Sequence, residues 1–263
     1  MKSTIKLFMI FLFLINTSIL FAQGSAGTKS EIEPRYLVDM NTAGILQKGM
    51  FSIMTEQLPE GVFILKMDVG IFNQFNFGIS YGAANFVGKG EMKFYKYPGV
   101  NVRFRLFDEE PSFPAILLGF DSQGKGEYLD SIRRFEVKSP GFYLVASKNF
   151  NFMGLLSLHG GLNYSLETSD QDNNLNIIVG VEKTIGQQIS VVAEYDFGLN
   201  DDENKVGRGR GYLNAGIRWS IGKGLTLGFD FRNLANNRIT DTFGGDRAFR
   251  LEFAAMIFWC LIS

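Results

Sequence analysis

Residues 225–232 read Leu-Thr-Leu-Gly-Phe-Asp-Phe-Arg and alternate strictly between apolar and polar or small side chains. Successive side chains of a β-strand point to opposite faces. A strand here therefore separates two sets: Leu225, Leu227, Phe229 and Phe231 on one face, and Thr226, Gly228, Asp230 and Arg232 on the other. An aromatic-rich apolar face opposite a face of glycine and both signs of charge is typical of a membrane β-barrel, with lipid outside and a polar lumen. The polar face of a soluble sandwich instead meets water and carries Lys, Thr and Ser.

The same alternation recurs along the chain, at residues 75–81, 100–106, 189–197, 213–221 and 249–259. We predict twelve strands, beginning near residues 50, 62, 73, 99, 113, 141, 152, 174, 188, 211, 224 and 247. The predicted fold class is all-β: a transmembrane antiparallel up-and-down β-barrel of about 12 strands over residues 49–263. Roughly ten or fourteen strands are the alternatives, because strand boundaries read from one sequence are uncertain by a few residues.

The connections support this topology independently. Short links alternate with long ones, as the short periplasmic turns and longer outer loops of such barrels do. The short links lie near residues 72, 108–112, 148–151, 184–187 and 221–223, and the long ones near 83–98, 121–140, 166–173, 198–210 and 233–246. The loop at residues 59–61 is the exception, because it lies on the long-loop side and is short.

The N-terminal segment has a different pattern. Lys2 and Lys6 flank the start of an apolar stretch that runs to Phe21, and small residues follow it. We interpret residues 1–23 as a secretory signal peptide, with a retained membrane helix as the alternative. Residues 24–48 have no strand rhythm; we predict a periplasmic N-terminal segment, with the barrel lumen as an alternative position. Beyond residue 23 no apolar run is long enough for a membrane helix, so we expect the exported chain to form a closed barrel in the bacterial outer membrane.

Composition narrows the classes of function. The chain has 26 Lys+Arg and 27 Asp+Glu, a formal net charge of −1, which gives no electrostatic reason to expect a nucleic-acid partner. One His and one Cys exclude an internal disulfide and a His- or Cys-rich metal site. The 26 Phe and 30 Gly exceed what a soluble domain needs. We predict no cofactor and no metal ion.

The polar faces of the predicted strands carry charges that would meet inside the barrel. Opposite charges in a confined lumen form cross-strand pairs that fix the interior. Because about eight strands give a filled barrel and sixteen or more leave a channel, such pairs predict a narrow or closed lumen here, and the 121–140 loop is long enough to fold inward as well. The predicted lumen charge network is Glu56, Lys66, Asp68, Arg103, Arg105, Glu182, Glu194, Asp196, Arg218, Asp230, Arg232, Arg250 and Glu252, with His159 as a further polar lumen residue.

His159 raises the question of catalysis. The outer-membrane phospholipase family places a serine two residues after its histidine, but Gly161 stands there in this chain. Ser157 has no oriented third group and no oxyanion donor in a strand pair alone. Glu194 and Asp196 could act as an acid–base pair, but several cations are predicted beside them, which favours structural ion pairs. We predict no catalytic residues.

Two loop tips, residues 170–173 and 200–204, are rich in carboxylate and amide oxygens. They could hold Ca²⁺, but they lack the glycine and distal glutamate of a calcium loop, so solvated outer loops are the preferred interpretation. Residues 207–211, Gly-Arg-Gly-Arg-Gly, have no strand-to-helix context for a phosphate loop and are a candidate contact to lipopolysaccharide at the outer rim.

One stretch, residues 113–150, supports a family resemblance. It contains Pro114-Ala115-Ile116-Leu117-Leu118-Gly119-Phe120-Asp121, then Gly124-Lys125-Gly126, then Tyr143-Leu144-Val145-Ala146-Ser147-Lys148. This stretch resembles the YjbH-type outer-membrane proteins, which are linked to exopolysaccharide production; residues 42–46 and 77–81 also fit related barrels. The chain is far shorter than the larger members, so the resemblance implies a single-barrel relative, and it supplies no catalytic residues.

Together these features predict a non-enzymatic outer-membrane barrel with a narrow charged lumen, for which the resemblance implies a role in exopolysaccharide or envelope biogenesis or export. A diffusion porin and an outer-membrane lipid or glycan hydrolase are the alternatives. The expected partners are outer-membrane lipid, lipopolysaccharide and the barrel-insertion machinery, with polysaccharide as a further candidate, and we expect a monomer. The last strand carries Phe258 and Trp259 but ends in Cys260-Leu261-Ile262-Ser263, so the terminal aromatic insertion signal is displaced.

Overall fold

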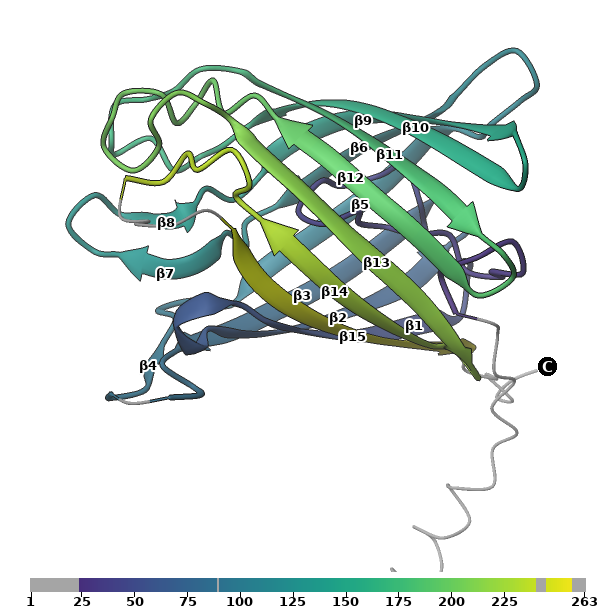
Figure 1. Ribbon diagram of the computed structural model, residues 1–263, viewed down its shortest axis with the longest axis horizontal. Coiled ribbons are helices and arrows are strands. Elements are labelled where there is room, and N and C mark those ends of the chain that lie inside the picture. The colour runs from purple at the N-terminus through teal and green to yellow at the C-terminus, as the bar shows by residue number, and fades with distance from the viewer. Residues whose placement is uncertain (1–23, 89, 240–244, 257–263) are drawn as a thin grey trace, which may run out of the picture.

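The barrel wall consists of twelve antiparallel strands. The computed structural model describes residues 24–88, 90–239 and 245–256. Each wall strand pairs with the next, and β15 pairs with β1 to close the cylinder (Figure 1). The predicted fold class is confirmed. The wall strands are β1 (Met50–Gln57), β2 (Phe63–Phe72), β3 (Phe75–Ala84), β5 (Gly99–Phe107), β6 (Ala115–Asp121), β9 (Gly141–Asn151), β10 (Leu155–Tyr164), β11 (Asn176–Ile185), β12 (Ile189–Asp196), β13 (Tyr212–Gly222), β14 (Leu225–Arg232) and β15 (Asp246–Met256).

The remaining elements lie in the long connections at one end of the barrel. They are the 3-10 turn η1 (Pro59–Gly61), the short strand β4 (Lys93–Phe94) beside the end of β3, and the hairpin of β7 (Lys125–Leu129) and β8 (Arg134–Val137). The η1 connection is short because Glu60 and Gly61 both have a positive φ, 58° and 68°, which reverses the chain within a single turn. Figure 1 shows β4, β7 and β8 at the end opposite the short turns.

The alternation in the sequence separates the two faces of the wall. On β14, Phe229 and Phe231 are exposed on the outside, whereas Asp230 and Arg232 are buried on the inside. The outer face is apolar around the barrel, and aromatic side chains border it at both ends: Phe72, Phe107 and Phe152 near the short turns, and Phe94, Phe142 and Tyr164 near the long connections. An apolar surface with aromatic borders is the surface that a transmembrane barrel presents to lipid.

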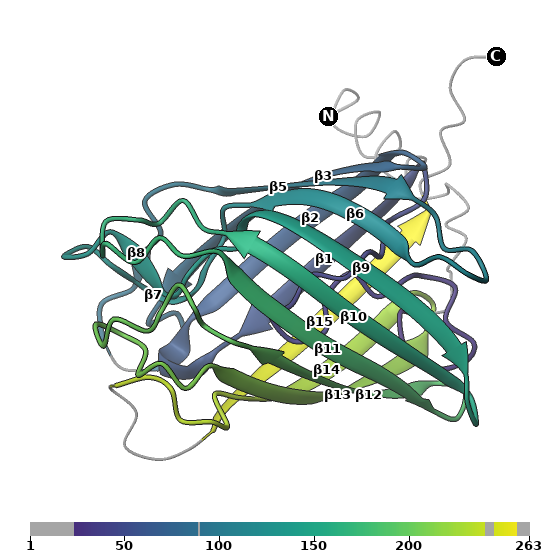
Figure 2. The same cartoon turned by 90° about the horizontal axis from the view of Figure 1, so that it is seen from above.

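Residues 24–48 lie inside the barrel, and we call them the plug. Figure 2 shows this purple segment within the cylinder. At its start, Ala26 N donates to Ser220 Oγ of β13 at 2.8 Å, and at its end Leu46 N donates to Asn76 Oδ1 of β3 at 2.7 Å. The plug forms no strand, so side chains of the wall take up its backbone groups.

Two predictions concern residues outside the described ranges: the signal peptide over residues 1–23, and the end of the last strand with Phe258, Trp259 and Cys260. Among the described residues, no helix is long and apolar enough to cross a membrane.

Candidate functional site: the closed lumen and its outer pocket

Arginines of the wall hold the carbonyl groups of the plug. Arg103 of β5 donates to Arg35 O at 2.7 Å and to Gly44 O at 2.9 Å. On the same strand Arg105 donates to Ala43 O at 3.1 Å, and on β15 Arg250 donates to Leu37 O at 3.0 Å. Charged donors make stronger hydrogen bonds than neutral ones, so these arginines replace the ladder that an irregular segment lacks.

A single carboxylate holds backbone N–H groups of the plug from the opposite wall. Glu194 of β12 accepts hydrogen bonds from Val38 N, Asp39 N and Met40 N at 2.8–2.9 Å. Three consecutive amides converge on this one side chain, which also accepts from Asn214 at 2.8 Å. The geometry therefore does not support the acid–base alternative for Glu194, which is engaged as an anchor for the plug.

Ion pairs also join the plug to the wall. Arg35 pairs with Asp68 of β2 at 2.6 Å and with Glu252 of β15. Two further plug carboxylates pair with wall arginines, Glu33 with Arg105 and Asp39 with Arg232. Other pairs join wall residues of the predicted network: Arg218 with Asp230 at 2.6 Å and Arg250 with Glu56 at 2.5 Å. Lys66 pairs at 3.5 Å with Asp121, which the predicted network did not include.

The plug also has an apolar contact with the wall. Leu37, Val38, Met40 and Ala43 are buried in one cluster with inward-facing wall residues, Ala115, Leu117, Tyr143, Val145 and Val192. Part of the lumen surface is thus apolar, which the expectation of a polar inner face missed. The signal was present at Ala115, Leu117, Tyr143 and Val145, where lumen-facing positions are apolar like the outer ones.

The β7–β8 hairpin covers the lumen from the long-connection end. Lys125 of β7 is buried, donates to Glu56 of β1, and lies 3.9 Å from Asp39 of the plug. Arg134 of β8 is fully buried and contacts carboxylate oxygens of Asp170 at 2.8 Å and Asp201 at 2.7 Å. The 121–140 connection therefore folds inward and joins the lumen network.

The two oxygen-rich loop tips meet at this hairpin. Asp170, Asp172 and Asp201 are buried, so the expectation of solvated tips is wrong for them. The physical reason is that Arg134 and Lys138 supply cations against these carboxylates, with Lys138 Nζ 2.7 Å from Asp170. Within the described ranges, no three His, Cys, Asp or Glu side chains are arranged to hold a metal ion.

The structure places every residue of the predicted charge network inside the barrel. Asp196 is half-buried and accepts from Asn176 at 2.7 Å; the others are buried: Glu56, Lys66, Asp68, Arg103, Arg105, Glu182, Glu194, Arg218, Asp230, Arg232, Arg250 and Glu252. Sequence reasoning missed their partners in the plug and hairpin: Glu33, Arg35, Asp39 and Lys125. The available signal was the charged residues among apolar ones at 35–40.

His159 lies on the inner face of β10 and is buried. Its Nδ1 is 2.8 Å from Ser147 Oγ of β9, and this hydroxyl also accepts from Ala43 N of the plug at 2.8 Å. Ser157 instead donates to Asn149 at 2.5 Å. The histidine therefore takes part, through Ser147, in fixing the plug.

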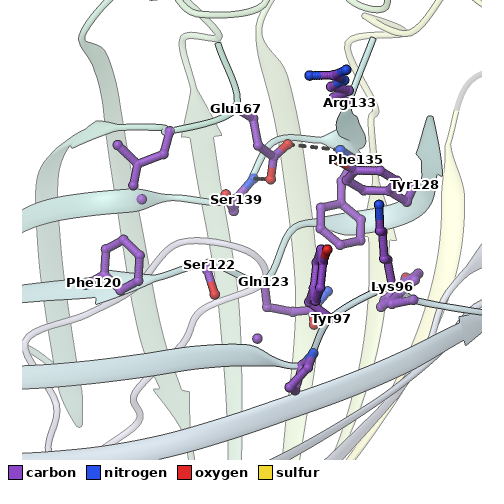
Figure 3. Close-up of a pocket in the computed structure, with 15 residues that line it drawn as sticks. Lys96, Tyr97, Phe120, Ser122, Gln123, Tyr128, Arg133, Phe135, Ser139 and Glu167 are labelled. Atoms are coloured by element: carbon purple, nitrogen blue, oxygen red, sulfur yellow. Dashed lines mark hydrogen bonds between the residues drawn. The ribbon is translucent and has the colours of Figure 1, made fainter. Parts of the chain in front are cut away.

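A separate pocket of about 310 Å³ opens at the long-connection end (Figure 3). Tyr97, Tyr128 and Phe135 stand on one side of it, with Lys96 beside them and Phe120 on the other side. Glu167 lines it too and accepts from Phe135 N at 2.9 Å and from Ser139 N at 3.1 Å. Burial raises the pKa of Glu167 above its ordinary value.

Comparison with known proteins gives likenesses of fold only. No family model matches the chain, and no curated protein matches it. Among solved structures, a KdgM porin is 11% identical, with 79% of this chain and 99% of that chain covered and a TM-score of 0.49. The outer-membrane protein Omp33 of Acinetobacter baumannii is 8% identical, with 80% and 99% covered and a TM-score of 0.45. The NanC porin is 7% identical, with 79% and 99% covered and a TM-score of 0.40. The likeness to all three is one of fold alone.

Proposed function

We propose that the protein is a non-enzymatic outer-membrane β-barrel whose lumen is closed by its own N-terminal segment. The observation that carries the proposal is the plug: wall arginines hold its carbonyls, Glu194 holds its amides, and both sets of contacts lie inside the closed cylinder. The apolar outer face with aromatic borders supports a position in the outer membrane.

Closure favours this function over an open diffusion porin. The plug crosses the lumen from β13 to β3, and the β7–β8 hairpin adds Lys125 and Arg134 above it. A barrel of twelve strands has an interior between that of a filled barrel and that of a porin channel. A segment of this size, with charged groups on the wall paired to it, leaves little of that interior for a continuous water path.

The geometry at His159 supports a structural role over a hydrolase. Its neighbour Ser147 is engaged with the plug amide of Ala43, and among the described residues no carboxylate hydrogen-bonds the imidazole to orient it as a catalytic base. A part in exopolysaccharide or envelope biogenesis or export remains the expectation that the resemblance of residues 113–150 implies.

Planar-bilayer recording of the purified protein tests the closed lumen. We expect no stable conductance from the wild type, and a leak when Arg103 and Arg105 are both replaced by alanine, because four plug carbonyls and Glu33 then lose their charged partners. Arg210→Ala, an exposed arginine at the long-connection end, is the matched control and should stay silent. A large, weakly selective conductance in the wild type would contradict the proposal and favour a porin.

A further inference from the structure

The outer pocket is a second feature, separate from the plug. Its lining comes from the connection before β5, the end of β6 and the residues after it, the β7–β8 hairpin, the start of β9 and the connection after β10, and it contains no plug residue. All these segments lie at the long-connection end, opposite the short turns (Figure 1). A cavity of about 310 Å³ is at the small end of the range for ligand pockets, the size of one or two sugar rings.

The aromatic side of the pocket is held in place by ring contacts beneath it. Phe135 meets Tyr95 edge-on at 4.9 Å between ring centroids and meets Tyr128 edge-on at 5.1 Å. Tyr95 is buried, and its hydroxyl donates to Gly126 O at 2.6 Å. These contacts fix the aromatic side of the pocket before any ligand arrives, which lowers the entropic cost of binding.

Tyr97 stands on this aromatic side of the pocket, and 71% of its surface is exposed to solvent. A large ring left in water beside a pocket is the kind of side chain that binding surfaces use, because it offers apolar area and a hydroxyl at little entropic cost. A pyranose presents an apolar face of C–H groups and a rim of hydroxyls. Tyr97 and Tyr128 match both, with rings for the face and phenolic hydroxyls for the rim.

The free charge of the pocket is positive. Lys96 and Arg133 are exposed, and neither forms an ion pair with a residue that the structure describes. The Lys96 ammonium lies 5.4 Å from the centre of the Tyr97 ring, so cation and ring form one unit. The carboxylate of Glu167 is already taken up by two backbone amides and serves to shape the 135–139 segment.

The backbone at Arg133 is also strained. Its φ of 51° lies in the left-handed region, which a long side chain adopts at a cost of roughly 1 kcal/mol. Glycine would adopt the same turn without this cost. The left-handed turn sets the position of Arg133 at the rim of the pocket.

We propose that this pocket binds an acidic saccharide, with a pyranose ring against Tyr97 and Tyr128 and its carboxylate between Lys96 and Arg133. The aromatic rings would contact the apolar face of the sugar ring, and the two unpaired cations would contact its carboxylate. Inorganic phosphate would use the cations but gain nothing from the rings. The site is independent of the closed lumen, so it holds whether or not the barrel conducts.

Two probes that differ only at C6 test the proposal: methyl β-D-glucuronide and methyl β-D-glucoside. Binding to the purified full chain is measured by saturation-transfer NMR titration in a detergent without a sugar headgroup. We expect the glucuronide to bind about three- to tenfold more tightly than the glucoside, the ratio that two exposed ion pairs provide, and the ratio to fall as salt is raised.

Variants separate the two parts of the site. Replacing Lys96 and Arg133 together by glutamine should abolish the preference for the glucuronide and leave glucoside binding unchanged. Tyr97→Ala should weaken both probes about fivefold, and Tyr97→Phe should restore most of that loss because it keeps the ring. Lys223→Gln, an exposed lysine in the turn between β13 and β14 at the short-turn end, is the matched control and should change nothing.

The proposal is overturned by any of three results. These are no binding of either glycoside, equal affinity for both, or a preference that survives the loss of Lys96 and Arg133. Glucuronide binding that is unaffected by Tyr97→Ala would also overturn it, because it would show a simple anion site. Heat-modifiable gel mobility confirms that each variant is folded, so a loss of binding is not a loss of the barrel.

Discussion

At the scale of single residues, Gly180 shows how closely the wall fits the plug. It lies on the inner face of β11 and pairs in register with His159 of β10 and Glu194 of β12. A Cβ atom at this position would lie 2.3 Å from Leu37 Cδ1 and 3.0 Å from Met40 Sδ, both in the plug. Position 180 therefore requires glycine, because the plug occupies the space that any larger side chain would need.

Replacing Gly180 by valine should displace the plug while leaving the barrel closed. Valine is favourable in a strand, so the wall itself is not weakened, but the added methyl groups overlap Leu37. We expect a leak conductance in planar bilayers together with wild-type heat-modifiable mobility. Gly160→Val is the matched control, because a Cβ at Gly160 of the neighbouring β10 meets nothing within 4 Å. If neither variant conducts, the plug adapts to the added side chain at position 180, and the prediction is wrong.

Residues 105–107 show where simple alternation fails. Leu106 and Phe107 are consecutive, and both are exposed on the outside. The pairing of β5 with β6 shifts between Arg105 and Phe107, so an extra residue is accommodated there as in a β-bulge. Arg105 can thus stay inside and reach Glu33 while the strand ends with an aromatic border.

At the scale of elements, the β7–β8 hairpin and two long connections behave as one unit. Arg134 of β8 links Asp170 in the connection after β10 to Asp201 in the connection after β12. Lys138 adds a second cation to Asp170. Three segments far apart in the sequence are joined at one buried guanidinium, so the ordered conformation of all three depends on this side chain.

Arg134→Ala should loosen these connections without opening the wall. Removing one partner of a buried ion pair typically costs about 3–5 kcal/mol, because a charge is left buried and unpaired. We expect limited proteolysis to cut within 166–173 and 198–210 at least tenfold faster than in the wild type, with the strands protected. Arg133→Ala, the exposed neighbour, is the matched control; an equal effect of both variants would contradict the role of Arg134.

The same unit should loosen in acid. Burial acts to raise the pKa of Asp170, but the hydrogen bonds from Lys138 and Arg134 outweigh it and hold the pKa below its ordinary value. A carboxyl with a lowered pKa in the folded state stabilises the fold above its unfolded pKa of about 3.9, and this stability is lost as the pH falls through the folded pKa. Hydrogen exchange of the 166–173 amides, corrected for intrinsic rates, should show constant protection from pH 7 to 5 and reduced protection below about pH 4; uniform protection throughout would contradict it.

At the scale of the whole molecule, closure leaves the wall without a free sheet edge. β15 pairs with β1 through eight residue pairs, from Met50 with Met256 to Gln57 with Phe249. Every wall strand has two neighbours, so the hydrogen-bond ladder satisfies the backbone throughout the region that faces lipid. Such a cylinder can open only by breaking a complete strand pair.

The purified protein should therefore show heat-modifiable mobility. Without boiling, the closed barrel stays compact in SDS and migrates faster than the heated, unfolded chain. Fractionation of cells should recover it with the outer membrane, as the apolar outer face requires. Recovery as a soluble periplasmic protein with a single mobility would contradict both the location and the stability argued for the barrel.

Much of this architecture follows from local sequence. Every predicted strand start lies within three residues of an observed one, because the period-two pattern and the turn residues are properties of neighbouring residues. The same parity placed the charged residues of the wall inside, from Glu56 on β1 to Glu252 on β15. It could not name the partners of those charges, since Arg35 and Glu252 are 217 residues apart in sequence.

The sequence by itself determined where the wall strands lie along the chain and which side of each faces lipid, because the alternation of apolar and polar residues is a local property of every strand. Only the tertiary structure decided what fills the cylinder. Residues 24–48 have no periodicity, and their place is set by the sum of contacts with nearly every part of the wall: carbonyls to Arg103, amides to Glu194, and apolar side chains to the cluster around Leu117. Those contacts exist only once the barrel has closed, because closure brings strands from both ends of the sequence around one segment.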